Sequence, residues 1–164
     1  MDDDTYQKVR DYALKLLSLR PRGTLEMSQK VSFYCRKRKI PPEAVTRLLQ
    51  DFTNSGFLND EEFVRWWILQ RRGQSKPKGT KFILRELLGK GISRDILEKV
   101  FYEEDHGIDT DFDRARALAA KRKNVMGKMP VQEMRMKLGN YLGRRGFDWE
   151  IVDKVLDEVV AKGR

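Results

Sequence analysis

The chain has 164 residues and a formal net charge of +9, with 34 lysines and arginines against 25 aspartates and glutamates. A basic balance of this size favours polyanionic partners such as nucleic acid or an anionic membrane. The single cysteine, Cys35, excludes an intrachain disulfide and a cysteine-rich zinc site, and it fits a reducing compartment. The uncharged runs are too short to span a membrane, and the acidic first residues differ from a signal peptide. We therefore expect a cytoplasmic protein with no membrane partner.

Apolar residues recur three and four positions apart along the whole chain, which predicts helices and no strands. The first helix is expected over Thr5–Leu19, ending before Pro21, and Thr24 is expected to cap the second. The pair Pro41-Pro42 is suited to begin the third helix. These helices form a first predicted three-helix repeat over residues 5–58.

The second predicted repeat covers residues 59–109. Asn59 can cap its first helix, as the opening residue of a sequence that resembles a capping box. Residues 73–79 are expected to form a loop, followed by a helix over Lys81–Lys90 and a further helix capped by Ser93.

The third predicted repeat covers residues 110–162. Thr110 together with Asp113 can open its first helix, and Pro130 can open its second. Asp148 is placed to cap the last helix.

One pattern of apolar residues occurs three times, once in each of these segments. A shift of 52 residues carries its first copy onto the second, and a further shift of 55 carries the second onto the third. The positions are Val31, Cys35, Ile40, Ala44, Val45, Leu48 and Leu49; Ile83, Leu87, Ile92, Ile96, Leu97, Val100 and Phe101; Leu138, Leu142, Phe147, Ile151, Val152, Val155 and Leu156. Repeats of this length bury their apolar faces on their neighbours. We expect an all-α fold, an elongated, curved array of three tandem three-helix repeats with nine helices.

Basic residues are concentrated in the first two predicted helices of each repeat. Residues 8–39 hold 10 basic and 2 acidic side chains, residues 65–90 hold 8 and 1, and residues 114–145 hold 10 and 1. The intervening residues 41–64 and 94–113 carry net charges of −4 and −6. If the repeats stack in register, one side of the array becomes a positive track. Solvated faces with a local charge bias are the alternative explanation.

A set of motifs at fixed spacing marks the middle of the chain. They are Gly56-Phe57-Leu58-Asn59-Asp60, Phe63-Val64, Trp67-Ile68, Arg71, Lys76-Pro77-Lys78-Gly79, Glu86-Leu87 and Lys90-Gly91-Ile92. Together they resemble the central module of the RecX recombination regulators, and the likeness runs from about Tyr6 to Val159. The chain departs from that family's pattern at Val64, where many members have alanine, and over residues 36–39, where a Lys-Gly turn is usual.

The resemblance implies a small bacterial protein that binds the RecA filament on single-stranded DNA. Members of that family modulate, and mainly inhibit, filament growth, ATP hydrolysis and strand exchange, in DNA recombination, DNA repair and the SOS response. We expect a monomer that requires no cofactor. A direct DNA-binding protein made of helix-turn-helix-like modules is the alternative, and the two differ in whether naked DNA is bound tightly with a steep dependence on salt.

Candidate partner-binding residues follow from the basic stretches, because lysine and arginine contact phosphates or acidic side chains. The set is Arg20, Arg22, Arg71, Arg72, Lys76, Lys78, Lys81, Arg85, Arg122, Lys123 and Lys128. Arg20, Arg71 and Arg122 occupy equivalent positions, and favourable contact with the carboxyl end of their own helices is the alternative explanation for them. Trp66 is the candidate surface aromatic, whereas Trp67 aligns with core leucines.

Arrangements typical of enzymes are missing from the sequence. His106 is the only histidine, within an acidic run that is better explained as a solvated helix end than as a metal site. The chain also lacks a glycine-rich phosphate loop followed by Lys-Ser or Lys-Thr. We expect no catalytic, cofactor or metal site, and a protein that is not an enzyme.

Overall fold

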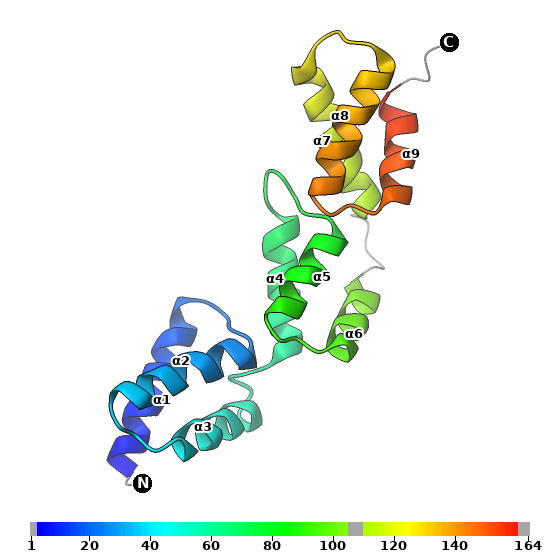
Figure 1. The fold of residues 1–164 in the computed structure, drawn as a ribbon. Coiled ribbons are helices and arrows are strands. Elements are labelled where there is room, and N and C mark those ends of the chain that lie inside the picture. The colour runs from blue at the N-terminus through cyan, green and yellow to red at the C-terminus, as the bar shows by residue number, and fades with distance from the viewer. Residues whose placement is uncertain (1–2, 105–109, 161–164) are drawn as a thin grey trace. The chain divides into compact units, whose positions relative to one another are not determined.

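The computed structural model describes residues 3–104 and 110–160, and these contain nine α-helices and no strand (Figure 1). The helices are α1 (Asp3–Leu19), α2 (Thr24–Lys37), α3 (Glu43–Asn54), α4 (Asp60–Arg72), α5 (Thr80–Gly89), α6 (Arg94–Glu104), α7 (Asp111–Met126), α8 (Val131–Arg144) and α9 (Trp149–Val159). The protein is an all-α helical repeat, as the apolar periodicity predicts.

The chain divides into two compact units. The first consists of residues 1–66 and 87–100, and the second of residues 67–86 and 101–164. The boundaries fall inside α4, α5 and α6, so that each of these helices contributes residues to both units. Each unit therefore contains one terminal set of three helices together with part of the middle segment.

In the first unit, α1, α2 and α3 pack around a single apolar core (Figure 1). Its buried residues are Tyr6, Val9, Ala13, Met27, Val31, Cys35, Ala44, Val45, Leu48, Phe52 and Leu58. The side chain of Cys35 is only 2% exposed, which confirms the expected core position. Burial also raises the pKa of its thiol, so that Cys35 serves packing rather than reactivity.

In the second unit, α7, α8 and α9 surround the other core (Figure 1). Its buried residues are Ala115, Leu118, Ala119, Met134, Leu138, Leu142, Phe147, Val152, Val155, Leu156 and Val160. Phe112, Met126, Met129 and Tyr141 are partly buried and pack against this core. Their outer sides are therefore available at the surface of the unit.

The repeated apolar positions are the ones that build the interior. Seventeen of the twenty-one are buried, and Ile40, Leu49, Ile96 and Ile151 are half-buried. None of them is exposed. The pattern therefore identified core positions in all three segments.

Most of the predicted helix starts are confirmed by local hydrogen bonds. The Asn59 side chain accepts from the backbone N–H groups of α4, Asp148 accepts from that of Glu150 in α9, and Ser93 accepts from that of Ile96 in α6. Thr110 opens α7 with a reciprocal capping box. These caps use residues within three positions of each other, which is why the sequence reveals them.

The predicted cap at Thr24 is wrong. Gly23 occupies the N-cap position of α2 and makes no side-chain cap, and Thr24 is the first helical residue. The backbone N–H of Thr24 instead donates to Oδ1 of Asp60, at the start of α4, over 2.8 Å. The helix end is therefore satisfied by a carboxylate from another helix.

The second unit repeats this arrangement. The backbone N–H of Thr80, at the start of α5, donates to Oδ2 of Asp111, at the start of α7, over 2.8 Å. In each unit a Gly-Thr pair, Gly23-Thr24 or Gly79-Thr80, thus begins a helix that is capped by the first aspartate of the next helical segment. We call these two arrangements the first and second junctions.

The turn between the second and third helix of each segment also repeats. Lys39, Gly91 and Gly146 occupy equivalent positions and have positive φ angles of 55°, 80° and 84°. In each case the next residue's N–H bonds back to the carbonyl four residues before the turn residue, as Ile40 does with Cys35 over 2.9 Å. Glycine adopts this conformation at little cost, whereas lysine is strained in it. The repeat therefore extends to backbone geometry, with one unfavourable residue in the first segment.

Candidate functional site

The predicted basic residues fall into two groups, those held by internal partners and those open to solvent. In the first unit, Arg20 bonds to Glu26 over 2.7 Å. Arg22 is buried, pairs with the same carboxylate and donates to the carbonyl of Leu16 over 3.1 Å. Burial alone would raise the pKa of Glu26, but the hydrogen bonds and charges of the two arginines outweigh it and lower that pKa. Arg22 is therefore a structural residue, and we leave it out of the proposed contact surface.

Arg71 is held in the second unit. Its guanidinium makes two bonds to the Glu86 carboxylate, of 2.7 and 3.0 Å, and lies 4.3 Å from the centre of the Trp67 ring. The indole N–H of Trp67 donates to the same carboxylate over 2.9 Å. Trp67 is half-buried rather than fully within the core, because its N–H and ring serve this network. The bidentate geometry fixes Arg71 in place.

Arg72 and Lys123 are also half-buried. The guanidinium of Arg72 lies 5.9 Å from the centre of the Phe101 ring. The ammonium of Lys123 donates to the carbonyl of Val159 over 2.7 Å and so satisfies the carboxyl end of α9. Both side chains contribute to the packing of the second unit.

The loop over residues 73–79 docks on the turn between α8 and α9. The Arg145 guanidinium donates to the backbone carbonyl of Lys76 over 2.6 Å, and the N–H of Gly79 donates to the Arg145 carbonyl over 2.9 Å. A Cβ atom on Gly79 would lie 2.4 Å from the carbonyl oxygen of Gly146, so that only glycine permits this approach. The ammonium of Lys81 completes the docking with an ion pair to Asp148 over 2.5 Å.

The docked loop, the start of α5 and the end of α8 carry basic side chains that are far apart in the sequence. We define the docked-loop surface as Lys76, Lys81, Arg85, Arg144 and Arg145. Lys76, Lys81, Arg85 and Arg144 are exposed, and Lys81 and Arg85 share a face of α5 because they are four residues apart. Among these five residues, Lys81 has a carboxylate partner in the described part of the chain, and its hydrogen bond is the main reason that the pKa of Asp148 is lowered. Within residues 3–104 and 110–160, Lys76, Arg85 and Arg144 make no ion pair.

Sequence reasoning missed Arg144 and Arg145. Their role depends on the loop that docks beside them, which lies almost seventy residues away in the chain. The available signal was their position directly before Gly146, where the second segment has Lys90 before Gly91. Lys78, by contrast, was predicted but is half-buried, with its ammonium 4.2 Å from the centre of the Phe82 ring.

Arg122 differs from its equivalent Arg71 because its partner has changed. Tyr141 stands at the position that Glu86 occupies in the preceding segment. The Arg122 guanidinium lies 5.4 Å from the centre of the Tyr141 ring, and that of Arg145 lies 5.3 Å from it. Arg122 is exposed and forms no ion pair with any described residue. It therefore extends the basic character of the docked-loop surface along α7 and α8.

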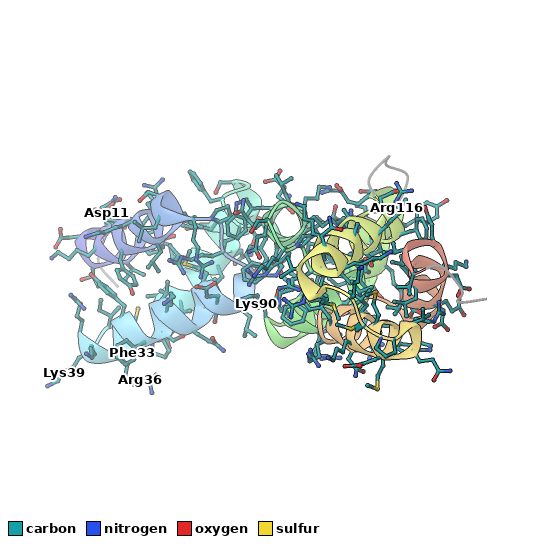
Figure 2. The ribbon with its side chains drawn as sticks, turned by 90° about the horizontal axis from the view of Figure 1, so that it is seen from above. Asp11, Phe33, Arg36, Lys39, Lys90 and Arg116 are labelled. Carbon is teal, nitrogen blue, oxygen red and sulfur yellow. The ribbon has the colours of Figure 1, made fainter. Side chains whose placement is uncertain are left out.

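The remaining candidates lie apart from this surface or are covered. Lys128 is exposed in the connection between α7 and α8. Trp66 is half-buried, and its ring centre lies 5.9 Å from that of Phe63. Figure 2 shows Phe33, Arg36 and Lys39 projecting from α2 and its end in the first unit, a basic and aromatic stretch outside the predicted set.

The described residues offer no group of three or more histidine, cysteine, aspartate or glutamate side chains that could hold a metal ion. His106 lies outside the residues that the structure describes. Among the helices of the described residues, none is both long and apolar enough to cross a membrane.

The comparisons with known proteins identify the chain's relatives. A family model described as "RecX, third three-helix domain" matches residues 109–156. The chain is 29% identical over 157 residues to the regulatory protein RecX of Bacillus pumilus, covering 94% of this chain, and 26% identical over 163 residues to that of Pelodictyon phaeoclathratiforme, covering 99%. These matches support the RecX family for this chain.

Solved RecX structures share the fold. The crystal structure of RecX from Lactobacillus salivarius matches with a TM-score of 0.81 and 22% identity, covering 95% of this chain and 97% of that chain. Curated RecX relatives differ in length. This chain spans 56% of the Bacillus pumilus protein and 96% of the Pelodictyon phaeoclathratiforme protein. These relatives are named regulatory proteins, so that a regulatory role is the function that the family supports.

Proposed function

We propose that this protein binds RecA nucleoprotein filaments on single-stranded DNA and modulates them, mainly by inhibiting filament growth, ATP hydrolysis and strand exchange. The similarity to RecX proteins supports the regulatory role. The observation that carries the proposal is the docked-loop surface, where Lys76, Arg85 and Arg144 are exposed and make no ion pair within the described part of the chain. Basic groups left without internal partners are available to an anionic partner.

Charge and geometry have different roles in this proposal. A filament that contains DNA carries a high density of phosphate charge, and a positive surface accelerates encounter with it. Arginine at Arg85 and Arg144 can make bidentate contacts with phosphates or carboxylates, while Lys76 acts as a mobile point charge. The attachment of the loop through Arg145 and Gly79 fixes the backbone that carries Lys76, while Arg85 and Arg144 are held by their helices.

We further propose that the chain acts as a monomer in the cytoplasm and has no catalytic centre of its own. In this proposal the three tandem repeats cover residues 5–58, 59–109 and 110–162. The similar junctions at Asp60 and Asp111, 51 residues apart, support that periodicity. Inhibition would then come from binding alone.

The test is RecA ATP hydrolysis on single-stranded DNA, measured against added protein. Wild-type protein is expected to inhibit at amounts well below one molecule per RecA. The triple variant K76E/R85E/R144E is expected to need at least about tenfold more protein, the change that follows from a loss of about 1.4 kcal/mol of binding free energy. All three side chains are exposed, so that circular dichroism and the thermal midpoint should stay close to wild type.

The matched control is K15E/K30E/R94E, which makes the same change in net charge at three exposed residues of the first unit. We expect this control to inhibit like wild type. Equal losses in both triple variants would show that net charge, and not the docked-loop surface, determines inhibition. If wild-type protein leaves ATP hydrolysis unchanged but binds naked DNA tightly, with affinity falling steeply as salt rises, the direct DNA-binding alternative replaces the proposal.

A further inference from the structure

The surface of the second unit contains a hollow of about 470 Å³ between α7 and α8. Arg122, Val125 and Met126 line it from α7, and four α8 residues at helical spacing line it from the other side: Lys137, Asn140, Tyr141 and Arg144. A volume of this size falls within the range of about 300–1,000 Å³ that is usual for ligand sites. The arrangement of apolar and basic side chains around the hollow indicates the kind of ligand that it binds.

The apolar side chains of the lining, which we call the floor of the hollow, are deformable. Met126, Met129 and Tyr141 line the hollow and pack from above on the core of the second unit. At its edge Val125 is 79% exposed. Methionine side chains adapt to apolar groups of different shape, which suits a site that receives a partner's side chain. An exposed valine beside them extends the apolar area that a partner would cover.

The rim of the hollow is basic. Arg122, Lys137 and Arg144 line it, and none of its lining residues is acidic. Lys137 is paired with Glu133 over 2.6 Å, whereas Arg122 and Arg144 have no ion pair within the residues that the structure describes. A neighbouring hollow of the same unit behaves differently, because there Arg116 pairs with Glu158 over 3.1 Å. The first hollow therefore retains an unbalanced positive charge around an apolar floor.

We propose that this hollow binds an acidic peptide segment of a partner protein, with an apolar side chain of that segment seated on Val125, Met126 and Met129. The acidic groups on either side of it pair with Arg122 and Arg144. Charge complementarity with the rim selects the acidic segment, and the apolar floor selects an anchor residue within it. The inference deepens the proposed function, on which it rests, because the segment would belong to the protein that this chain regulates.

A nucleobase fits the hollow less well. Bases bind proteins by stacking on aromatic rings or guanidinium planes. The one aromatic ring of the hollow, that of Tyr141, already has the guanidinium groups of Arg122 and Arg145 at 5.4 and 5.3 Å from its centre. Aliphatic and thioether groups form the rest of the floor, and these suit an aliphatic side chain better than a base.

The test uses a short fluorescent peptide with a central leucine flanked by aspartates and glutamates, titrated with the full chain in fluorescence polarisation. V125D and R122Q are each expected to weaken its binding about tenfold, because the first places a like charge against the peptide and the second removes a charge pair. The same peptide with serine in place of leucine is expected to bind wild type about tenfold more weakly.

Two control variants match these changes. M136D alters an exposed apolar residue of α8 outside the hollow, and K121Q removes an exposed charge next to Arg122 that does not line it. We expect both to bind the leucine peptide within about twofold of wild type. Unchanged binding in V125D and R122Q would overturn the inference, as would equal binding of the serine peptide.

A fluorescent oligothymidine, titrated in the same way, decides between peptide and nucleic acid. If it binds wild type, is weakened by V125D and R122Q, and is not displaced by the leucine peptide, the hollow is a nucleic-acid site and the inference is wrong. The assay contains no recombinase. Failure of the peptide to bind, with inhibition of ATP hydrolysis intact, would therefore overturn this inference and leave the proposed function standing.

Discussion

The two junctions have the same backbone arrangement and differ in the charged side chains around them. In both, a Gly-Thr pair begins a helix whose first N–H is accepted by an aspartate, Asp60 in the first unit and Asp111 in the second. In the first unit the nearby arginines, Arg20 and Arg22, pair with Glu26. In the second unit the loop over residues 73–79 adds exposed basic groups. Both units thus use the same backbone arrangement at the junction, and the charged side chains around it differ.

The largest expected effect is a loss of stability on substitution of Asp111, which should exceed the loss on substitution of Asp60. Asp111 also pairs with Arg114 over 2.7 Å, and the Arg114 side chain is only 5% exposed. D111A should therefore destabilise the protein by about 3–5 kcal/mol, since it removes both a helix cap and a charge-assisted hydrogen bond to a buried guanidinium. D60A should cost only about 1–2 kcal/mol, the loss of a helix cap. Urea unfolding followed by circular dichroism measures both, and equal losses would contradict this difference between the junctions.

The second effect concerns Gly91 and Gly146, the glycines of the α5–α6 and α8–α9 turns. In G146A the new Cβ would lie 2.5 Å from the backbone nitrogen of Phe82, and in G91A it would lie 2.4 Å from a terminal carbon of the Leu25 side chain. Backbone cannot move aside as a side chain can. We expect G146A to lose about 3 kcal/mol or more and G91A about 2 kcal/mol, including the strain of a positive φ angle.

Hydrogen exchange of backbone amides shows which helices lose stability in G146A and in G91A. Amides of α7, α8 and α9 should lose protection in G146A, and amides of α1, α2 and α3 in G91A. The reverse order of the two losses would show that the close approach of Gly146 to Phe82 does not control the stability of the second unit.

The smallest effect is a gain in stability. Lys39 holds the positive-φ position that glycine holds in the other two segments. K39G should relieve about 1 kcal/mol of backbone strain, partly offset by the greater freedom of glycine in the unfolded chain, for a net gain of about 0.5 kcal/mol. Thermal unfolding by calorimetry is sensitive to this gain. A loss of stability in K39G would indicate that the lysine side chain contributes contacts that outweigh its strain.

Features of the fold that depend on neighbouring residues could be predicted from the sequence. The spacing of Val31, Cys35 and Leu48 marks a helical face, and these side chains are buried. Thr110 and Asp113 are close enough in sequence for their capping box to be evident. Thr24 was misassigned because its true acceptor, Asp60, lies 36 residues away. Long-range contacts of this kind leave little trace in a local pattern.

The candidate site could be predicted only in part, because it too depends on contacts between residues that are distant in the sequence. A basic loop at Lys76 was evident from composition, but its docking on Arg145 depends on packing between distant segments. Equivalent positions also acquired different partners. Arg71 faces Glu86, whereas Arg122 faces Tyr141, so that one arginine is fixed and the other is open. Repeat alignment identifies such positions, and only their surroundings show which are available to a partner.

The most direct test compares binding of the labelled protein to single-stranded DNA coated with RecA and to the same DNA naked. At physiological salt the account predicts clear preference for the coated strand, and loss of that preference in K76E/R85E/R144E with retention in K15E/K30E/R94E. Equal affinity for coated and naked DNA, or a triple variant at the docked-loop surface that binds the coated strand like wild type, would contradict it.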